Sequence, residues 1–336
     1  MRITTNAILR DYKSNLSTSI NNLNISRTHV MTQRSFNSTA EDPASAARAS
    51  QLHRKYYKNQ DNIKMLQDVQ NRQDCQEDAL RQVSDMVTNI SKNYNLQALN
   101  GTNQTTEVRQ SYASAIRQFQ QSMVLSLNSS YEDTFLFAGS DGKNPPFNLT
   151  SEGTLTYRGV DINANIGSTD YNKLKKMSNE SLYVDLGMGL SMNDFDQVVS
   201  SSAFNMSLPG INAVGYGNDQ NGMSNNLILI AGKLADTLEA ETFDADQFSN
   251  LMNKFDLLGK NLMNQITELG VKSEFLTTTK DRLDNAEISI QEQMSSVEGV
   301  DMAEAISNYM WDQYAYNAAL KVGTSILSPS FIDFMR

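Results

Sequence analysis

The sequence has little of what most metal sites and nucleophilic active sites require. Among 336 residues there is one cysteine, Cys75, and there are two histidines, His29 and His53. A single cysteine cannot form an internal disulfide, and two histidines argue against a histidine-based metal site. No recognisable motif places either histidine beside Cys75, so the sequence indicates no nucleophilic triad. We expect Cys75 to be a packing or surface thiol, and we expect no cofactor.

Positive charge and long apolar runs are also scarce. Lys and Arg number 28 against 38 Asp and Glu, so the net charge is −10 and the pI is about 4.8. Nucleic-acid backbones are bound by clustered basic residues, which argues against such a partner. The longest clear apolar run is LILIA at 227–231, far short of the roughly 18 residues that cross a bilayer. We expect neither nucleic-acid binding nor membrane insertion.

The first fifteen residues, MRITTNAILRDYKSN, do not resemble a secretory signal peptide. They contain no apolar core and no cleavage site formed by small residues. If the protein leaves the cell, we expect it to do so without a cleaved signal peptide.

Carboxylates occur beside predicted bends rather than in catalytic spacing. Glu41 and Asp42 precede Pro43, and Asp301 and Glu304 form a similar junction. Carboxylates at the start of a helix accept hydrogen bonds from free N–H groups and favour the helix dipole. The glycines form neither a phosphate-binding loop nor a dinucleotide motif. We therefore predict helix caps and no catalytic residues, which indicates a protein that is not an enzyme.

Glycine and proline gather in the middle of the chain. Eleven of the 17 glycines and three of the five prolines fall between 139 and 222. Within this block, TLTYR at 154, INANI at 162 and SLYVDL at 181 are short, partly alternating and bounded by turn residues, which predicts strands. We expect an inserted β-rich domain at 143–222. An enzyme or ligand-binding module there is a competing interpretation, although the block contains no His or Cys.

The C-terminal flank carries a seven-residue apolar repeat. Its members are Phe248, Phe255, Leu262, Leu269, Leu276, Leu283, Ile290 and Val297. Such a repeat keeps one narrow stripe facing a partner helix, as in a coiled coil. A single helix over 244–297 would be about 80 Å long at 1.5 Å per residue. Because a compact globule of this chain length has a radius of gyration of about 20 Å, we expect an elongated molecule.

The N-terminal flank has a matching but more polar repeat. Its two interleaved sets are Leu52, Asn59, Leu66, Gln73, Leu80, Val87 and Tyr94, and Tyr56, Ile63, Gln70, Glu77, Ser84 and Ser91. A turn is expected at 100–106, followed by amphipathic helices over 112–127 and 224–240. The predicted fold is mainly α with an inserted β domain, in which 32–142 and 223–300 form an elongated helical bundle built from both chain ends.

Both extreme ends are amphipathic as well, over 1–31 and 301–336. Their apolar stripes are Leu9, Leu16, Leu23 and Val30, and Met302, Ile306, Tyr309, Tyr316, Leu320 and Leu327. Two helices that bury only one narrow stripe gain little stability on their own. We therefore expect these ends to form a terminal coiled-coil domain and to serve as an assembly interface with neighbouring subunits.

The C-terminal end is unusually apolar. No charge occurs between Lys321 and Asp333, whereas chain ends are generally polar. The apolar residues are Tyr316, Leu320, Ile326, Leu327, Phe331, Ile332 and Phe334. We interpret this end as a surface that a partner covers.

Three stretches resemble the bacterial flagellin superfamily. NSTAEDPASAARASQL at 37–52 resembles its loop-to-helix signature, and LRQVSDMVTNISKNYNLQALNGTN at 80–103 resembles the helix that ends in Asn-Gly-Thr. LGVKSEFLTTTKDRLDNAEISIQEQMSSVEGVDMAEAIS at 269–307 resembles the C-terminal long helix and its junction. The resemblance covers roughly 1–142 and 224–336, and the three stretches occur in the family's order.

Further details resemble the members of the superfamily that occupy the hook–filament junction. These are MRITTN at the start, YEDTFLFAGSDGKNPPF at 131–147 and LSPSFIDFM at 327–335. The resemblance implies a structural adaptor in the extracellular flagellum that serves motility, and filament flagellin itself remains the alternative. It also implies that the terminal helices form an inner tube, the bundle a surrounding wall, and the insert an outward-facing domain.

The resemblance also implies the partners. These would be other copies in a ring, hook-associated protein 1 on the hook side, and flagellin on the filament side. Export would run through the flagellar type III channel, after a cytoplasmic export chaperone has held the apolar C-terminal residues named above.

Overall fold

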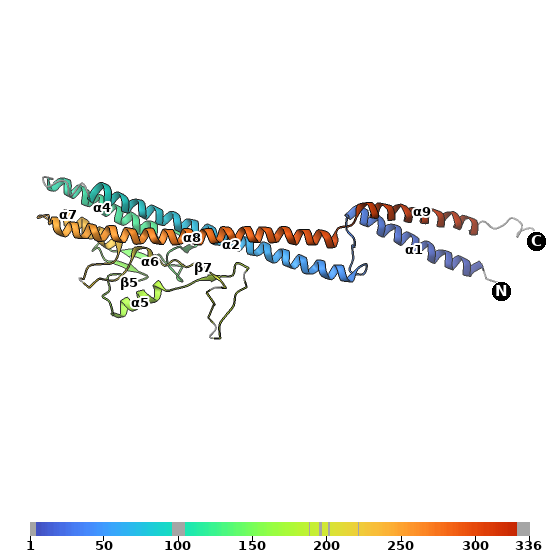
Figure 1. Cartoon of the computed structure of the whole chain (residues 1–336), viewed down its shortest axis with the longest axis horizontal. Coiled ribbons are helices and arrows are strands. Elements are labelled where there is room, and N and C mark those ends of the chain that lie inside the picture. Colours follow the sequence, from blue (N-terminus) through green and yellow to red (C-terminus); the bar gives the residue numbers. More distant parts are fainter. Residues whose placement is uncertain are drawn as a thin grey trace, which may run out of the picture. The chain divides into compact units, whose positions relative to one another are not determined.

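The structure is a computed structural model that describes residues 5–95, 105–187, 189–194, 197–200, 202–220 and 222–327. Helices form both flanks of the chain, and short strands lie in the middle (Figure 1). The predicted class, mainly α with an inserted β region and built from both chain ends, is confirmed. The turn expected at 100–106 lies mostly outside the described residues.

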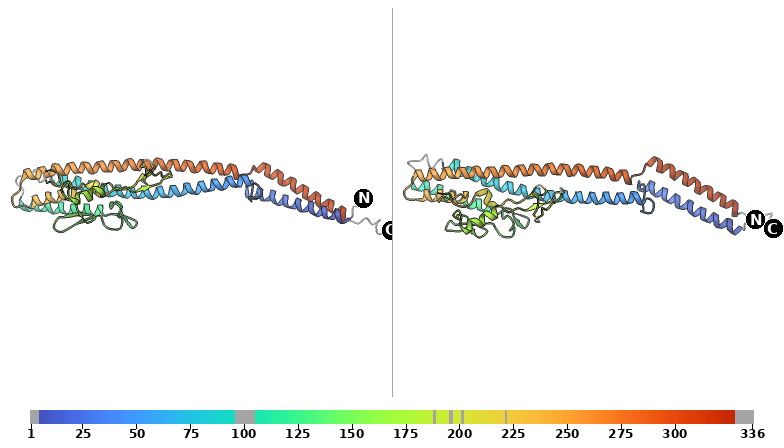
Figure 2. Two further views of the ribbon diagram at one scale, coloured as in Figure 1. Left: turned by 90° about the horizontal axis from the view of Figure 1, so that it is seen from below. Right: turned by 60° about the horizontal axis from the view of Figure 1, so that its bottom comes forward.

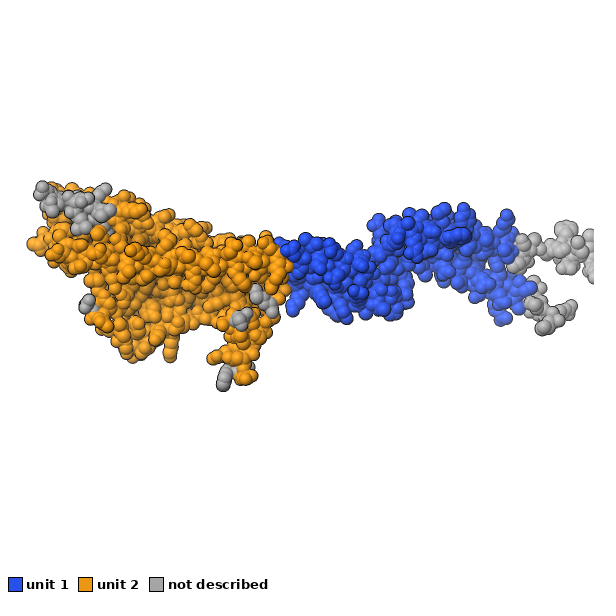
Figure 3. All heavy atoms as spheres, in the orientation of Figure 1, with its two compact units in different colours: residues 1–60, 284–336 blue, residues 61–283 orange. Residues whose placement is uncertain are grey.

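The two ends of the chain come together as a pair of helices. Helix α1 (Thr5–Thr32) and helix α9 (Met302–Leu327) lie side by side in all the views of Figures 1 and 2. They belong to one of two compact units, formed by residues 1–60 with 284–336 (Figure 3). The other unit is formed by residues 61–283.

Two connecting segments in the first unit are tied together by the backbone. The Ser35 N–H donates to the Glu298 carbonyl at 2.8 Å, the Val300 N–H donates to the Gln33 carbonyl at 3.2 Å, and Arg34 forms a bridge with Gly299. The segment after α1 is thereby held against the segment that precedes α9.

The predicted helix caps are confirmed for the aspartates. Asp42 Oδ1 accepts hydrogen bonds from the Ala44 and Ser45 N–H groups at the start of helix α2 (Pro43–Asn89). Asp301 Oδ1 does the same for the Ala303 and Glu304 N–H groups at the start of α9, at 2.8 and 3.3 Å. Cap hydrogen bonds from Ser45 hold the pKa of Asp42 below its usual range.

Glu41 does not cap the helix. Its Oε2 accepts the Asn37 N–H at 2.8 Å and lies 3.3 Å from His29 Nε2, so it closes the loop after α1 instead. His53 Nε2 likewise lies 2.6 Å from Glu298 Oε1. Both histidines are therefore paired with carboxylates inside the first unit.

The second unit contains a helical core. It is formed by parts of α2 and α8 (Ala245–Glu298), with α4 (Thr106–Leu127), α7 (Leu227–Glu239) and a π-helix, η1 (Ile90–Asn95). The seven-residue repeat predicted on α8 is confirmed, since its members in this unit are fully or almost fully buried. They are Phe248, Phe255, Leu262, Leu269, Leu276 and Leu283.

The repeat on α2 is partly different from the prediction. Leu66, Gln73, Leu80 and Val87 are buried as expected. In the predicted second set Ile63 is buried as expected, but Gln70, Glu77, Ser84 and Ser91 are only half-buried, and the residues one position before these four are buried instead. Those earlier residues are Val69, Gln76, Val83 and Ile90. One of them, Gln76, donates its side-chain amide to the Leu136 carbonyl at 2.9 Å, so α2 packs against the inserted region as well as against helices.

The described residues between α4 and α7, which include the predicted insert and are called the inserted region, form three small antiparallel sheets. The first pairs β1 (Ser130–Tyr131) with β2 (Thr134–Phe135). In the second, β4 (Leu155–Tyr157) lies between β3 (Phe147–Leu149) and β5 (Val160–Asp161) and pairs with both. The third pairs β6 (Tyr183–Val184) with β7 (Phe204–Asn205). Two short helices, α5 (Thr169–Ser178) and α6 (Gly210–Val214), complete it. Its apolar side chains share one cluster with those of α4, α7 and α8, so this region packs directly on the helices.

The strand predictions for this region are only partly right. TLTYR contains β4 and SLYVDL contains β6, but INANI at 162 is not a strand. The Asp161 carboxylate accepts the Asn163 N–H at 2.9 Å and turns the chain at that point. Aspartate and asparagine favour such turns, which overrides the alternating pattern.

Gly215 offers a test of how tightly the inserted region meets the helices. Its φ is 82°, and a Cβ there would overlap the Asn225 carbonyl oxygen. Gly153 has the same φ, but its Cβ would have nothing within 4 Å. Both alanine variants incur the strain of a positive φ, and Gly215, with ψ 166°, also lies in a backbone region that only glycine adopts readily, which adds to its loss. We expect Gly215→Ala to lower the free energy of unfolding, measured in denaturant, by at least about 1 kcal/mol more than Gly153→Ala. Equal losses would contradict the steric argument.

Glu180 links two turns of the inserted region. It accepts the Ser140 N–H at 2.9 Å and the Arg158 guanidinium at 2.8 Å. Burial raises the pKa of Glu180, but the hydrogen bonds from Ser140 and Arg158 outweigh it and leave the pKa below its ordinary value of 4.5. The carboxylate therefore stabilises the fold above pH 4.5, and this contribution is lost as the pH falls through the folded-state pKa.

The corresponding prediction concerns Glu180→Gln. We expect this variant to be less stable than the wild type at pH 7, by no more than about 1 kcal/mol because the pair is partly exposed. The difference should shrink towards pH 3. The measurement is the free energy of unfolding at both pH values, and a difference that does not change with pH would refute the assignment.

Candidate assembly interface

The seam between α1 and α9 follows a regular spacing. The residues of both helices that are shielded from solvent recur in alternating steps of three and four. They are Leu9, Tyr12, Leu16, Ser19, Leu23, Ser26 and Val30 on α1, and Met302, Ala305, Tyr309, Asp312, Tyr316, Ala319 and Gly323 on α9. This is the spacing with which two helices pack as a coiled coil.

Small and polar residues let the two helices approach closely. A Cβ added to Gly323 would overlap the Tyr12 hydroxyl, so Gly323 provides the space that this ring occupies. The Ser26 hydroxyl donates to the Asp312 carboxylate across the seam. The seam is therefore specified by shape and one hydrogen bond as well as by apolar burial.

The expected assembly residues divide into two groups. Leu9, Leu16, Leu23, Val30, Met302, Tyr309 and Tyr316 lie in the seam. Ile306 and Leu320 do not, because they are 45% and 40% exposed. Ala305 and Ala319 lie in the seam instead. The pattern of large apolar residues in the sequence did not indicate these two alanines. The Leu327 side chain lies outside the part of the chain that the structure describes.

Several large apolar side chains remain exposed on α9, distributed around the part of the helix that lies outside the seam. They are Ile306, Met310, Trp311, Tyr314, Leu320 and Val322. Trp311 is 71% exposed and Tyr314 is 67% exposed. Contiguous exposed apolar surface typically marks an interaction site. The helix pair thus buries one seam within the chain and leaves these large apolar side chains exposed.

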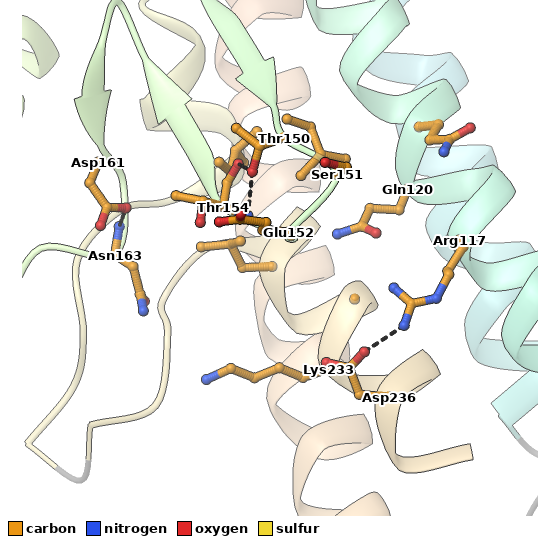
Figure 4. A pocket seen from close by; sticks show the side chains of 16 residues that line it. Arg117, Gln120, Thr150, Ser151, Glu152, Thr154, Asp161, Asn163, Lys233 and Asp236 are labelled. Carbon is orange, nitrogen blue, oxygen red and sulfur yellow. Dashed lines mark hydrogen bonds and ion pairs between the residues drawn. The ribbon is translucent and has the colours of Figure 1, made fainter. Parts of the chain in front are cut away.

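An alternative candidate site is a hollow in the second unit, between the β3–β4 turn and helices α4 and α7 (Figure 4). It measures about 530 Å³. The Arg117 guanidinium points to carboxylates on α7, at 2.6 Å from Asp236 and 2.8 Å from Glu239. The hydrogen bond with Glu239 is the main reason that the pKa of Arg117 lies above its usual value. The charge of Arg117 is thus already balanced within the chain.

The described residues also hold no group of three or more His, Cys, Asp or Glu placed to bind a metal ion. Cys75 is half-buried against the helical core, as expected for a packing thiol. No helix in the described ranges is both long enough and apolar enough to cross a membrane. The exposed face of the terminal helix pair is therefore the surface that we take as the candidate site.

These features define a helical protein in which the N-terminal and C-terminal helices pack against each other. Comparison with known families agrees with that description. Residues 3–141 match the bacterial flagellin N-terminal helical region, and residues 252–328 match the bacterial flagellin C-terminal helical region. The chain belongs to the bacterial flagellin family.

Solved structures share the fold at low sequence identity. A flagellar hook-associated protein from Vibrio parahaemolyticus is 17% identical, with a TM-score of 0.56 over 77% of this chain and 100% of that chain. FlgL from Bacillus cereus is 16% identical, with a TM-score of 0.50 over 73% of this chain and 99% of that one. No curated protein sequence matches the chain.

Proposed function

We propose that this protein is a structural subunit of the bacterial flagellum, an adaptor that connects a hook-associated protein to the flagellin filament. The observation that carries the proposal is the terminal helix pair, which buries one seam within the chain and leaves large apolar side chains of α9 exposed for contacts with other subunits. The family membership and the fold shared with hook-associated proteins support a flagellar role.

In this proposal the molecule has three functional parts. Residues 1–31 with 301–336 line an inner tube, residues 32–142 with 223–300 form the wall around it, and residues 143–222 face outward. Copies form a ring, with hook-associated protein 1 on the hook side and flagellin on the filament side. The ring acts by helix packing, without catalysis.

The proposal includes export without cleavage and binding by a chaperone before export. The candidate contacts are Tyr316 and Leu320, with Ile326, Leu327, Phe331, Ile332 and Phe334. The first two lie on α9, where Leu320 is 40% exposed. The side chains of the other five lie outside the described residues. A chaperone bound there would shield the apolar surface until assembly covers it.

Filament flagellin is the alternative function within the same family. The segments YEDTFLFAGSDGKNPPF and LSPSFIDFM favour the adaptor because they resemble junction proteins. A deletion of the gene separates the two. Loss of an adaptor should release unpolymerised flagellin into the medium, whereas loss of the only flagellin leaves a hook and no filament protein.

Labelling an intact flagellum tests the proposal directly. A short epitope inserted at Gly153, in an exposed turn with nothing within 4 Å of the added Cβ, should leave the fold unchanged. We expect the antibody label to be confined to the boundary between hook and filament. Label along the whole filament would support flagellin and overturn the adaptor.

A further inference from the structure

An acidic cleft lies in the first unit where α9 begins. Its volume is about 700 Å³, and its lining includes Ile25 and His29 from α1 and Glu304, Trp311 and Asp312 from α9. Trp311 is the one tryptophan of the chain and is 71% exposed. An indole face beside carboxylates is a favourable environment for a cationic side chain.

The cations near this cleft leave its negative charge largely uncompensated. His29 is engaged by Glu41, and Arg34 lies 3.5 Å from Glu298. Neither Arg34 nor Arg27 is among the residues that line the cleft. Glu304 is exposed and has no ion pair within the described part of the chain. The cleft therefore remains acidic.

The other end of α1 has the complementary charge. Arg10 and Lys13 are exposed and line a hollow of about 440 Å³ with Leu9 and Tyr12. These cations cannot reach the cleft of their own chain. Fifteen residues of helix separate Arg10 from Ile25, which is about 22 Å at 1.5 Å per residue.

We propose that the acidic cleft at Trp311 receives the Arg10 and Lys13 end of α1 from a second copy of this chain. The contact is head to tail, because one surface of a copy meets a different surface of the next. Such contacts generate rings when the rotation closes. The inference rests on the proposed ring of copies. It names the contact that would set how each copy is placed against the next.

Charge exchange in the full-length chain tests this contact. We expect Glu304→Lys alone, and Arg10→Glu with Lys13→Glu, each to raise the protein concentration needed for self-association by about tenfold. Combining all three changes should restore association to near the wild-type value, because the charges are exchanged rather than lost. Lys64→Glu, on an exposed position of α2, is the matched control and should have no effect.

Sedimentation gives the association, and Trp311 emission reports whether the cleft is occupied. Because Glu304 lies in the first turn of α9, Glu304→Gln serves as a second variant that removes the charge without reversing it, and it should have an intermediate effect. Far-UV circular dichroism checks the helix content of each variant.

Three results would overturn the inference. They are a wild type that stays monomeric, reversals that leave association unchanged, and an exchange that fails to restore it. Each of these would leave the labelling result on the flagellum untouched. Conversely, label along the filament would reject the adaptor while a successful charge exchange still supported the head-to-tail contact.

Discussion

Replacing Phe255 by alanine is expected to lower the free energy of unfolding by about 3–5 kcal/mol. Phe255 is completely buried on α8, within the cluster that joins the helices to the inserted region. The loss combines the transfer of the ring from water with the cavity that its removal leaves. Chemical denaturation followed by far-UV circular dichroism measures it.

Leu257 provides the matched control for this prediction. It lies two residues further along the same helix, but it is 53% exposed. Leu257→Ala should change the free energy of unfolding by no more than about 0.5 kcal/mol. If both variants lose stability equally, the buried face of α8 is not the one described.

Gly323→Val is expected to prevent assembly of the full-length protein. The added side chain would overlap the Tyr12 hydroxyl in the seam between α1 and α9. Overpacking of this kind costs about 1–3 kcal/mol. This is a large fraction of the stabilisation free energy that two helices obtain by burying one narrow stripe. The measurements are self-association by sedimentation and swimming of cells that carry the variant.

Two further variants separate this clash from a general effect of valine. Ala318 is exposed on the same helix, so Ala318→Val should assemble normally. Tyr12→Ala should restore assembly to Gly323→Val, because it removes the atoms that the valine meets. Failure of this rescue would show that Gly323 is needed for a reason other than space beside Tyr12.

The repeat on α8 could be predicted from the sequence because large apolar residues mark every seventh position. The seam of α9 could be predicted only in part. Ala305, Asp312 and Ala319 are small or charged, so a pattern based on large apolar residues indicates Ile306 and Leu320 instead. Close approach of two helices requires small residues, and their importance emerges only when the partner helix is in place.

Individual hydrogen bonds between residues far apart in the sequence were beyond prediction. Gln76 is buried because its amide finds the Leu136 carbonyl, and His53 finds Glu298 from the other end of the chain. From the sequence alone, polar residues in a heptad repeat are expected to face solvent, because their buried hydrogen-bond partners are not known. The same reasoning applies to the cleft at Trp311, because its lining joins Ile25 and His29 of α1 to residues of α9.

The backbone tie between Ser35 and Glu298 has a mechanical consequence. The segment after α1 and the segment before α9 are hydrogen-bonded to each other. A force or torque applied to one terminal helix is therefore distributed over both connecting segments. The hydrogen bond between His53 and Glu298 adds a side-chain contact to the same connection. A subunit of a rotating flagellum would thus carry torsional load on two connecting segments at once. Separating these segments would require several hydrogen bonds to break together.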